Sequence, residues 1–400
     1  MFIELHILQN FAPSNLNRDD TNQPKDTEFG GWRRARISSQ SLKRAMRFDP
    51  AFGANTGVEP SKRTKWITRT LVERFKDKGK LEEESLVVAT LFAEVYAGGL
   101  DKKHPGRTNV MLYLSPGDQR SVIETLWPLW ENLLKIPGEI QATEQITDKK
   151  KREKAVEKAR EPLADFAKEL IKKTENRTTD APDIALFGRM LTEHPETNVD
   201  AACQVAHAIS THAIRMDSDF FTVVDDLKKD DETGSGGLWT TGFNSACMYR
   251  YARLDFGKLV ENLHGDKELA LKTVKAFLLA AEAAIPSGKQ NSFAAHNRPS
   301  FMLAVARAPK SAGWSLANAF ESPVRPHNSA GLVAPSVKAL DEYWQGLCAF
   351  YGESSVAAKA VAIETRLTGE LSEGLQAAHQ DSLEAWAEVM VEALAKAEAV

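Results

Sequence analysis

Six basic residues and no acidic residue lie between positions 33 and 47, a pattern that suits contacts with phosphate groups. The six are Arg33, Arg34, Arg36, Lys43, Arg44 and Arg47. Cations that track a nucleic-acid backbone give affinity without reading the base sequence. The alternative is a solvated helix face with no ligand, and the lack of a neighbouring acid argues against it.

The same segment contains the start of an expected helix, with Ser38 and Ser39 as candidate caps. A helix start offers free backbone N–H groups and the positive end of the helix dipole, and both favour a phosphate. Gln40, Lys43 and Arg47 follow at spacings of three and four, so they share one face of that helix.

The net charge of the chain first argues against a nucleic-acid partner. Its 400 residues include 51 basic and 55 acidic ones, a formal charge of −4. Taking out the six cations of the basic segment leaves −10 on the rest of the chain. A basic segment on an acidic body is the asymmetry that matters for the choice of partner.

A second candidate is the pair of aromatic residues in Asp219-Phe220-Phe221-Thr222. Neighbouring residues of a strand point to opposite faces, so one ring is expected to be exposed, where it can stack on a base. By residue type alone, both rings could instead be buried. Met190, after Gly188-Arg189, is by default a core residue but could also wedge against a base.

Weaker signals come from loops and from carboxylates. Arg325 and His327 lie in a Pro-rich loop that could meet a phosphate, although surface cations are common. No metal, nucleophile or phosphate-loop motif is present, so no catalytic residue, metal or cofactor is predicted. Asp26, in a loop rich in Asn, Asp and Gly, has no second metal ligand or base near it in the sequence.

Several classes of protein are excluded. The mean hydropathy is −0.35, and no apolar run of about 18 residues exists, so no membrane partner is expected. The first residues do not resemble a signal peptide. The three cysteines are far apart and form no CxxC pair, which argues against disulfides and a Cys-based zinc site. The chain is therefore expected to be intracellular and cytoplasmic.

The elements that must position these residues follow from periodicity. Strands are expected at 2–10, 184–190 and 301–306, a long ordered loop at 11–32, and a hairpin-like excursion within 212–254. Helices are expected from 39, through most of 60–175, and at 201–209, 266–285, 337–350 and 382–397. This order predicts an α+β sandwich of ferredoxin-like type with a helical insertion at 56–179.

Several stretches resemble one known family over nearly the whole chain. They are LNRDD (16–20), QPKD (23–26), FGG (29–31), RRARISSQSLKRAMR (33–47), DIALFGRM (183–190), AHAISTH (206–212), DFFTVVDDL (219–227), YRYARLD (249–255), IPSGKQNSFAAHN (285–297), SLANAFE (315–321) and APSV (334–337). These motifs resemble the CasC family, the backbone subunit of the type I-E CRISPR surveillance complex Cascade. The region 50–180 resembles the family least.

The resemblance implies a hand-shaped fold. Its palm resembles an RNA-recognition (ferredoxin-like) domain and would comprise 1–55, 180–211 and 246–350. The fingers would be the helical insertion 56–179, the thumb a β-hairpin at 212–245, and a helical segment would follow at 351–400. Several copies would stack along one CRISPR guide RNA, each thumb kinking it, while its bases pair with target DNA.

The resemblance also assigns the RNA contacts. They fall on Arg18, Lys25, Ser38, Gln40, Lys43, Arg47, Met190, Phe220, Phe221, Thr222, Arg325 and His327, with Ser39 and Arg44 as neighbours that share the role. His327 departs from the family, since members can carry lysine there and imidazole is only partly charged near neutral pH. Phe220 stands where tryptophan can occur, and either ring can stack on a base.

The family implies a non-catalytic, RNA-binding subunit in antiviral defence. Its partners would be the guide RNA, target DNA, other copies of itself, and subunits of the CasA, CasB, CasD and CasE types. Two alternatives remain open. One is a CRISPR-type ribonuclease that uses a loop aspartate, Asp26 or Asp20. The other is a scaffold whose basic strip binds an acidic neighbour.

Overall fold

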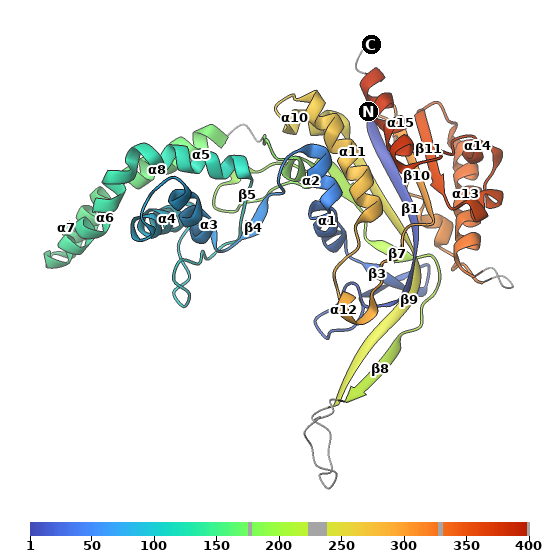
Figure 1. Ribbon diagram of the computed structural model, residues 1–400, viewed down its shortest axis with the longest axis horizontal. Coiled ribbons are helices and arrows are strands. Elements are labelled where there is room, and N and C mark those ends of the chain that lie inside the picture. The colour runs from blue at the N-terminus through green and yellow to red at the C-terminus, as the bar shows by residue number, and fades with distance from the viewer. Residues whose placement is uncertain (175–177, 223–237, 327–330, 398–400) are drawn as a thin grey trace, which may run out of the picture. The chain divides into compact units, whose positions relative to one another are not determined.

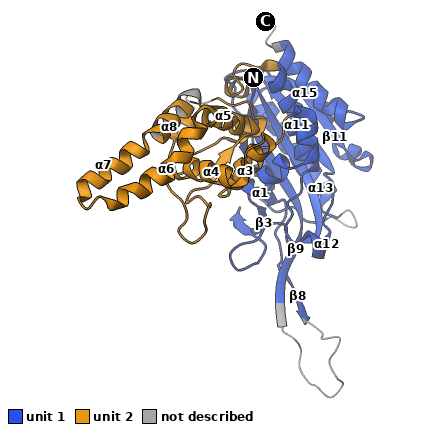
Figure 2. Cartoon of the chain, turned by 60° about the vertical axis from the view of Figure 1, so that its left-hand side comes forward, with its two compact units in different colours: residues 1–57, 203–257, 268–400 blue, residues 58–202, 258–267 orange. Residues whose placement is uncertain are grey.

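The computed structural model describes residues 1–174, 178–222, 238–326 and 331–397 (Figure 1). It divides into two compact units, coloured separately in Figure 2. The first comprises residues 1–57, 203–257 and 268–400, and the second residues 58–202 and 258–267. Helices combine with an antiparallel sheet, which confirms the predicted α+β class.

One antiparallel sheet organises the first unit, with strands in the order β11–β10–β1–β9–β7–β3–β2. Its strands are β1 (Phe2–Ser14), β2 (Asp26–Phe29), β3 (Trp32–Ile37), β6 (Cys203–Val205), β7 (Ala208–Ser210), β8 (Asp217–Thr222), β9 (Leu238–Asp255), β10 (Phe301–Arg307) and β11 (Val356–Ile363). β6 and β8 also pair with β9. The predicted strands at 2–10 and 301–306 are confirmed as β1 and β10.

Helices cover both faces of this sheet. They are α1 (Ser39–Arg47), α2 (Pro50–Thr56), α11 (Lys267–Ala283), α12 (Gln290–Phe293), α13 (Val333–Tyr351), α14 (Glu373–Gln376) and α15 (Leu383–Ala397), with short 3₁₀ turns η4 (Ala317–Phe320) and η5 (Thr365–Glu370). Leu5 and Ile7 of β1 lie beside α1 and α11, whereas Leu8 packs in the core that contains Leu340 and Trp344 of α13. The alternation of residues along β1 supplies apolar side chains to both layers.

The second unit is mainly helical. Its elements are β4 (Lys62–Thr64), α3 (Ile67–Asp77), α4 (Glu82–Tyr96), β5 (Leu112–Leu114), α5 (Pro116–Leu126), η1 (Trp127–Leu129), α6 (Trp130–Ala142), η2 (Thr143–Gln145), α7 (Lys149–Ala159), α8 (Glu161–Thr174), α9 (Pro182–Phe187) and η3 (Pro195–Thr197). α10 (Phe256–Asn262) begins in the first unit and ends in the second. Ile67, Leu71 and Phe75 of α3 are buried at a spacing of four, the expected core stripe of a helix.

Two predicted elements are of the wrong type. Residues 184–190, predicted as a strand, contain the end of α9, because a short apolar run does not distinguish a buried helix from a buried strand. Residues 201–209, predicted as a helix, form β6 and β7, because β9 supplies the hydrogen-bond partners for both. The residues of this Ala-rich stretch do not by themselves indicate that it pairs with β9, which is distant in the sequence.

Other differences concern loops and bounds. The loop predicted at 11–32 contains the end of β1 and the hairpin of β2 and β3, whose turn places Gly30 and Gly31 at φ +62° and +76°. Such angles favour glycine and suit a two-residue hairpin turn. The segment expected to be helical at 351–400 includes strand β11. Residues 180–202, expected in the palm, group with the second unit.

Among the described helices, none is both long and apolar enough to cross a membrane.

Candidate nucleic-acid interface

The start of α1 is capped and fixed. Ser38 has extended backbone angles, and its hydroxyl accepts a hydrogen bond from the N–H of Ser41 at 3.4 Å, so Ser38 rather than Ser39 is the N-cap. Ser38 in turn donates its own N–H to Oδ1 of Asn17 at 2.8 Å. This bond ties the helix start to the loop before β2.

That loop is ordered by its own side chains. Oδ1 of Asp19 accepts hydrogen bonds from the hydroxyl and N–H of Thr21, at 2.8 and 2.9 Å, and from the N–H of Gln23 at 2.9 Å. These bonds, the Thr21 hydroxyl first, lower the pKa of Asp19 below its ordinary value. Arg18 donates to Oδ1 of Asn22 at 2.8 Å and remains exposed. The loop therefore presents Arg18 in a fixed position.

The base of β9 supports the other side of the loop. Nδ2 of Asn15 donates to the carbonyl of Gly242 at 2.8 Å, and a Cβ at position 242 would lie 1.7 Å from Oε1 of Gln23. Only glycine allows so close an approach. A side chain at position 242 would force the side chain of Gln23 to move and would press on the ring of Pro24 in this loop.

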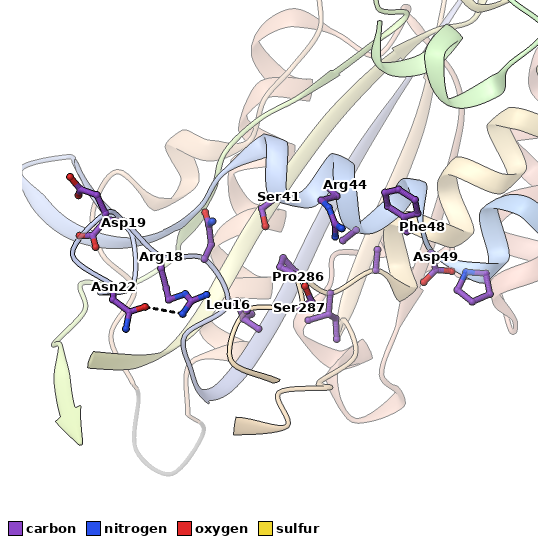
Figure 3. Close-up of a pocket in the computed structure, with 17 residues that line it drawn as sticks. Leu16, Arg18, Asp19, Asn22, Ser41, Arg44, Phe48, Asp49, Pro286 and Ser287 are labelled. Atoms are coloured by element: carbon purple, nitrogen blue, oxygen red, sulfur yellow. Dashed lines mark hydrogen bonds between the residues drawn. The ribbon is translucent and has the colours of Figure 1, made fainter. Parts of the chain in front are cut away.

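A cleft of about 780 Å³ opens between this loop, α1 and the segment 284–288 (Figure 3). Figure 3 shows Arg44 extending from α1 toward the segment that carries Pro286 and Ser287. A Cβ at Gly288 would lie 2.3 Å from the carbonyl oxygen of Leu16, so this segment packs directly on the loop. The carboxylates of Asp19, Asp20 and Asp49 also line the cleft, so its charge is mixed.

The six cations of the basic segment differ in how deeply they are buried. Arg34 is fully buried and donates to the carbonyls of Ser210, Phe320 and Glu321 at 3.2, 2.8 and 3.1 Å, which makes it a structural residue. Its burial lowers the pKa of the guanidinium. Arg33 forms an ion pair with Asp26. The six cations thus do not form one exposed strip.

On α1 itself, the polar and charged side chains differ in exposure. Gln40 and Arg44 are exposed and Lys43 is half-buried, whereas Arg47 is only 4% exposed. The guanidinium carbons of Arg44 and Arg47 lie 5.1 and 5.2 Å from the ring centre of Phe48, within the range of a cation–π contact. The accessible cation of this helix end is therefore Arg44.

A second group of cations lies around His207, between β6 and β7. Nη1 of Arg36 lies 3.0 Å from Nδ1 of His207. Burial, followed by the charges of Arg36 and Lys25, lowers the pKa of His207 below its ordinary value. Lys25 was predicted from the sequence motifs, but the pair of Arg36 and His207 was not, because 171 positions separate the two residues and no spacing pattern joins them.

β8 and the start of β9 form a two-stranded ribbon, paired from Asp217 opposite Phe243 to Thr222 opposite Leu238. Phe220 is 64% exposed and Phe221 42% exposed. One exposed ring was predicted, and both rings are exposed in the structure. Residues 223–237, including the Gly-rich stretch 234–237, lie outside the described part of the chain.

Met190 belongs to the second unit and is 82% exposed. Its neighbour Arg189 is buried, donates to the carboxylate of Asp118 at 2.7 Å and exchanges backbone hydrogen bonds with Val199. Leu191, on the other side, is 3% exposed and donates its N–H to Oδ1 of Asn198 at 2.6 Å. An exposed methionine held between two buried neighbours contradicts the default expectation of a core residue.

The remaining predicted residues are less informative. Arg325 is exposed, and its neighbour Val324 donates its N–H to the carbonyl of Thr211 at 3.0 Å. His327 lies outside the described residues. Within the described ranges, no three His, Cys, Asp or Glu side chains are grouped as metal ligands would be.

Comparisons with known proteins agree with the sequence motifs. A family model described as CT1975-like protein (Cas_CT1975) matches residues 3–389. A chain of a solved "CRISPR RNA-guided surveillance complex, pre-nicking" is 30% identical with a TM-score of 0.75, and the match covers 98% of this chain and 100% of that one. A chain of a "CRISPR RNA-guided surveillance complex" is 25% identical with a TM-score of 0.58, at the same coverage.

No curated protein matches the chain. The family match extends over nearly the whole length, and the similar structures are matched over their full length. The family predicted from the motifs is therefore confirmed: the chain belongs to the CT1975-like, CasC-type family and is a subunit of a CRISPR surveillance complex.

Proposed function

We propose that this subunit binds the backbone of a CRISPR guide RNA and performs no catalysis itself. The observation that carries the proposal is the pair of exposed cations, Arg18 and Arg44, on two fixed walls of the cleft beside α1. Guanidinium groups are well suited to phosphate oxygens, and the contact is independent of base sequence. The similar structures are described as RNA-guided complexes, which fits a guide as the ligand.

The palm of this proposal is a ferredoxin-like core within the first unit. In that fold four antiparallel strands occur in the order 4-1-3-2, with one helix after the first strand and another after the third. The neighbouring strands β10, β1, β9 and β7 have this order, and α1 and α11 follow β1 and β9 along the chain. The match in order and connection supports the assignment.

The ribbon of β8 and β9 would act as the thumb that kinks the guide. Two exposed aromatic rings on adjacent positions, Phe220 and Phe221, offer stacking surfaces for bases on both sides of the ribbon. Met190 would act as an apolar wedge against a base. Repetition of these contacts by several copies along one guide would leave its bases free to pair with target DNA, beside subunits of the CasA, CasB, CasD and CasE types.

The ribonuclease alternative is less well supported. The carboxylate of Asp26 is engaged by Arg33, and Asp20 lies on the cleft wall without a grouping of metal ligands in the described ranges. A metal-dependent RNA cleavage assay tests it. RNA cleavage by the wild-type chain that Asp26→Ala or Asp20→Ala abolishes would contradict the non-catalytic assignment.

Binding of a labelled single-stranded RNA by the full chain tests the proposed contact. We expect Lys43→Ala with Arg44→Ala to weaken binding about tenfold or more for unrelated RNA sequences alike, and to flatten its salt dependence. The matched control is Lys338→Ala with Arg366→Ala, which removes the same charge from exposed positions of the first unit. Equal binding by the two double variants, or a loss confined to one RNA sequence, would contradict backbone binding at α1.

A further inference from the structure

Arg36 and His207 form a polar pair that no family motif assigns to a ligand. Arg36 lies on β3, and His207 lies in the connection between β6 and β7. Nη1 of Arg36 is 3.0 Å from Nδ1 of His207. Arginine can only donate, so Nδ1 accepts, the imidazole is neutral, and its proton resides on Nε2.

The guanidinium of Arg36 is held in place rather than extended into solvent. Its Nε donates to the carbonyl of Asp26 at 3.1 Å, and the backbone N–H of Arg36 donates to the carbonyl of Lys25 at 2.9 Å. The bonds of Nε to Asp26 and of Nη1 to His207 use two of the five N–H groups of the guanidinium. Within the described part of the chain, no further side-chain contact of Arg36 is found. Donors therefore remain for a ligand.

The surroundings of the pair are positive. The charges that act on His207 are those of Arg36 and Lys25, and both of them, after burial, lower its pKa. On α1, Lys43 acts on the neighbouring Cys203. The carboxylate next to Lys25 in the chain, that of Asp26, is paired with Arg33.

The strand beneath does not compensate this charge. β9 pairs with β6 and β7, and Tyr251 accepts the N–H of Ala206 through its backbone carbonyl. Arg250 of the same strand is buried, with its guanidinium directed to Oε1 of Gln9 and the carbonyl of Ala281. An exposed imidazole beside two cations, with donors that form no hydrogen bond in the described residues, fits an anion with several acceptor oxygens.

We propose that Lys25, Arg36 and neutral His207 form a phosphate-binding site for the guide-RNA backbone, additional to the cleft beside α1. Lys25 and Arg36 supply the charge, and Arg36 positions His207 so that its Nε2–H donates to a phosphate oxygen. The inference rests on the proposed function, because the phosphate is that of the bound RNA. It predicts that loss of the charged Arg36 changes the salt dependence of RNA binding, whereas loss of the neutral His207 does not.

The test is equilibrium binding of a fluorescein-labelled single-stranded RNA to the full chain over a series of salt concentrations. Arg36→Gln should weaken binding about tenfold and lower the slope of log Kd against log salt by about 0.7, the value for one phosphate contact on a single strand. His207→Ala should weaken binding about threefold with the slope unchanged, because a neutral donor releases no counterion. His207→Gln, which can accept from Arg36 and still donate, should recover most of the loss.

Arg366→Gln and His379→Gln are matched controls at exposed positions of the first unit. If Arg36→Gln does not fold, Arg36→Lys should bind more weakly with an unchanged slope, because the charge stays and the hold on His207 is lost. Binding by Arg36→Gln and His207→Ala that equals the controls would overturn this site, while the α1 double variant still tests the cleft. A lowered slope in His207→Ala would contradict a neutral donor, and a wild-type chain that binds no RNA would overturn site and proposed function together.

Discussion

The basic segment 33–47 and the ribbon of β8 and β9 differ in where their side chains find partners. In the basic segment, Arg34 is enclosed by three backbone carbonyls and Arg47 is nearly covered. On the ribbon, Phe220 and Phe221 are both exposed. Two charged side chains of the basic segment are thus buried within the first unit, whereas two apolar side chains of the ribbon are exposed to solvent. Changes at the buried cations of the first region should act on folding, and changes at the exposed rings of the second on binding.

The largest expected effect is that of Arg34→Met. It leaves the carbonyls of Ser210, Phe320 and Glu321 without this donor in a buried place, which should lower the free energy of unfolding by about 3 kcal/mol. Arg44→Met, the same substitution at an exposed position, should change it by less than about 0.5 kcal/mol. Urea unfolding measures both, and equal stability of the two variants would contradict the structural role of Arg34.

The ribbon should show the opposite behaviour. Phe220→Ala with Phe221→Ala removes two stacking surfaces, and loss of a stacked base weakens RNA binding by about 1–3 kcal/mol. The single variant Phe220→Ala should change the free energy of unfolding by less than about 0.5 kcal/mol, since this ring is 64% exposed. Replacement by two tryptophans should preserve binding. Unchanged RNA affinity in the double alanine variant would remove the ribbon from the interface.

Acid should destabilise the sheet unit through His6 of β1. This fully buried imidazole lies 2.9 Å from the Tyr249 hydroxyl, and burial, then the charge of Arg307, lowers its pKa to about 3. Between about pH 6.5 and 3 the unfolded chain binds a proton that the folded chain does not, so stability falls as the pH falls. The loss from this group between pH 7 and 5 is about 2 kcal/mol.

His6→Gln isolates that contribution, because glutamine does not titrate. Urea unfolding of the variant at pH 7 and pH 5 should show a smaller loss than the wild type by about this amount. His379→Gln, the same substitution at an exposed position of the same unit, is the matched control. An identical pH dependence in wild type and His6→Gln would show that other groups cause the acid sensitivity.

The smallest effect on folding is expected for Met190→Ala. The side chain is 82% exposed, so the free energy of unfolding should change by less than about 0.5 kcal/mol. Arg189→Met, one position earlier, should be clearly destabilising because it leaves Asp118 without its buried partner. Thermal unfolding compares the two. A large destabilisation by Met190→Ala would mean that this side chain packs after all.

Several elements of this fold could be predicted from local sequence patterns. The helix at α1 follows from its serine cap and apolar stripe, and β1 and β10 follow from apolar runs of strand length. β6 and β7 could not be predicted, because their conformation depends on β9, a strand distant in the sequence. The helix α9 was missed because all six of its residues are buried, which removes the periodicity that would identify it.

The sequence predicted a basic site for phosphate groups, but it did not predict which basic residues are exposed there. The sequence motifs pointed to Arg18, Lys43 and Arg44. Arg18 lies in the loop beside the capped start of α1, and Lys43 and Arg44 lie on α1 itself. The burial of Arg34 could not be foreseen, since its three acceptors come from positions 210, 320 and 321. The pair of Arg36 and His207 arises in the same way, from the packing of β3 beside β7.

The most direct test of the central claim is to express the chain with a CRISPR array and the other subunits of its complex and to analyse the RNA that co-purifies. The account predicts a nuclease-protected guide RNA of uniform length, with several copies of this chain on each RNA. The double variant Lys43→Ala with Arg44→Ala should retain less of it in high salt. A complex that assembles with this subunit but contains no guide RNA would contradict the account.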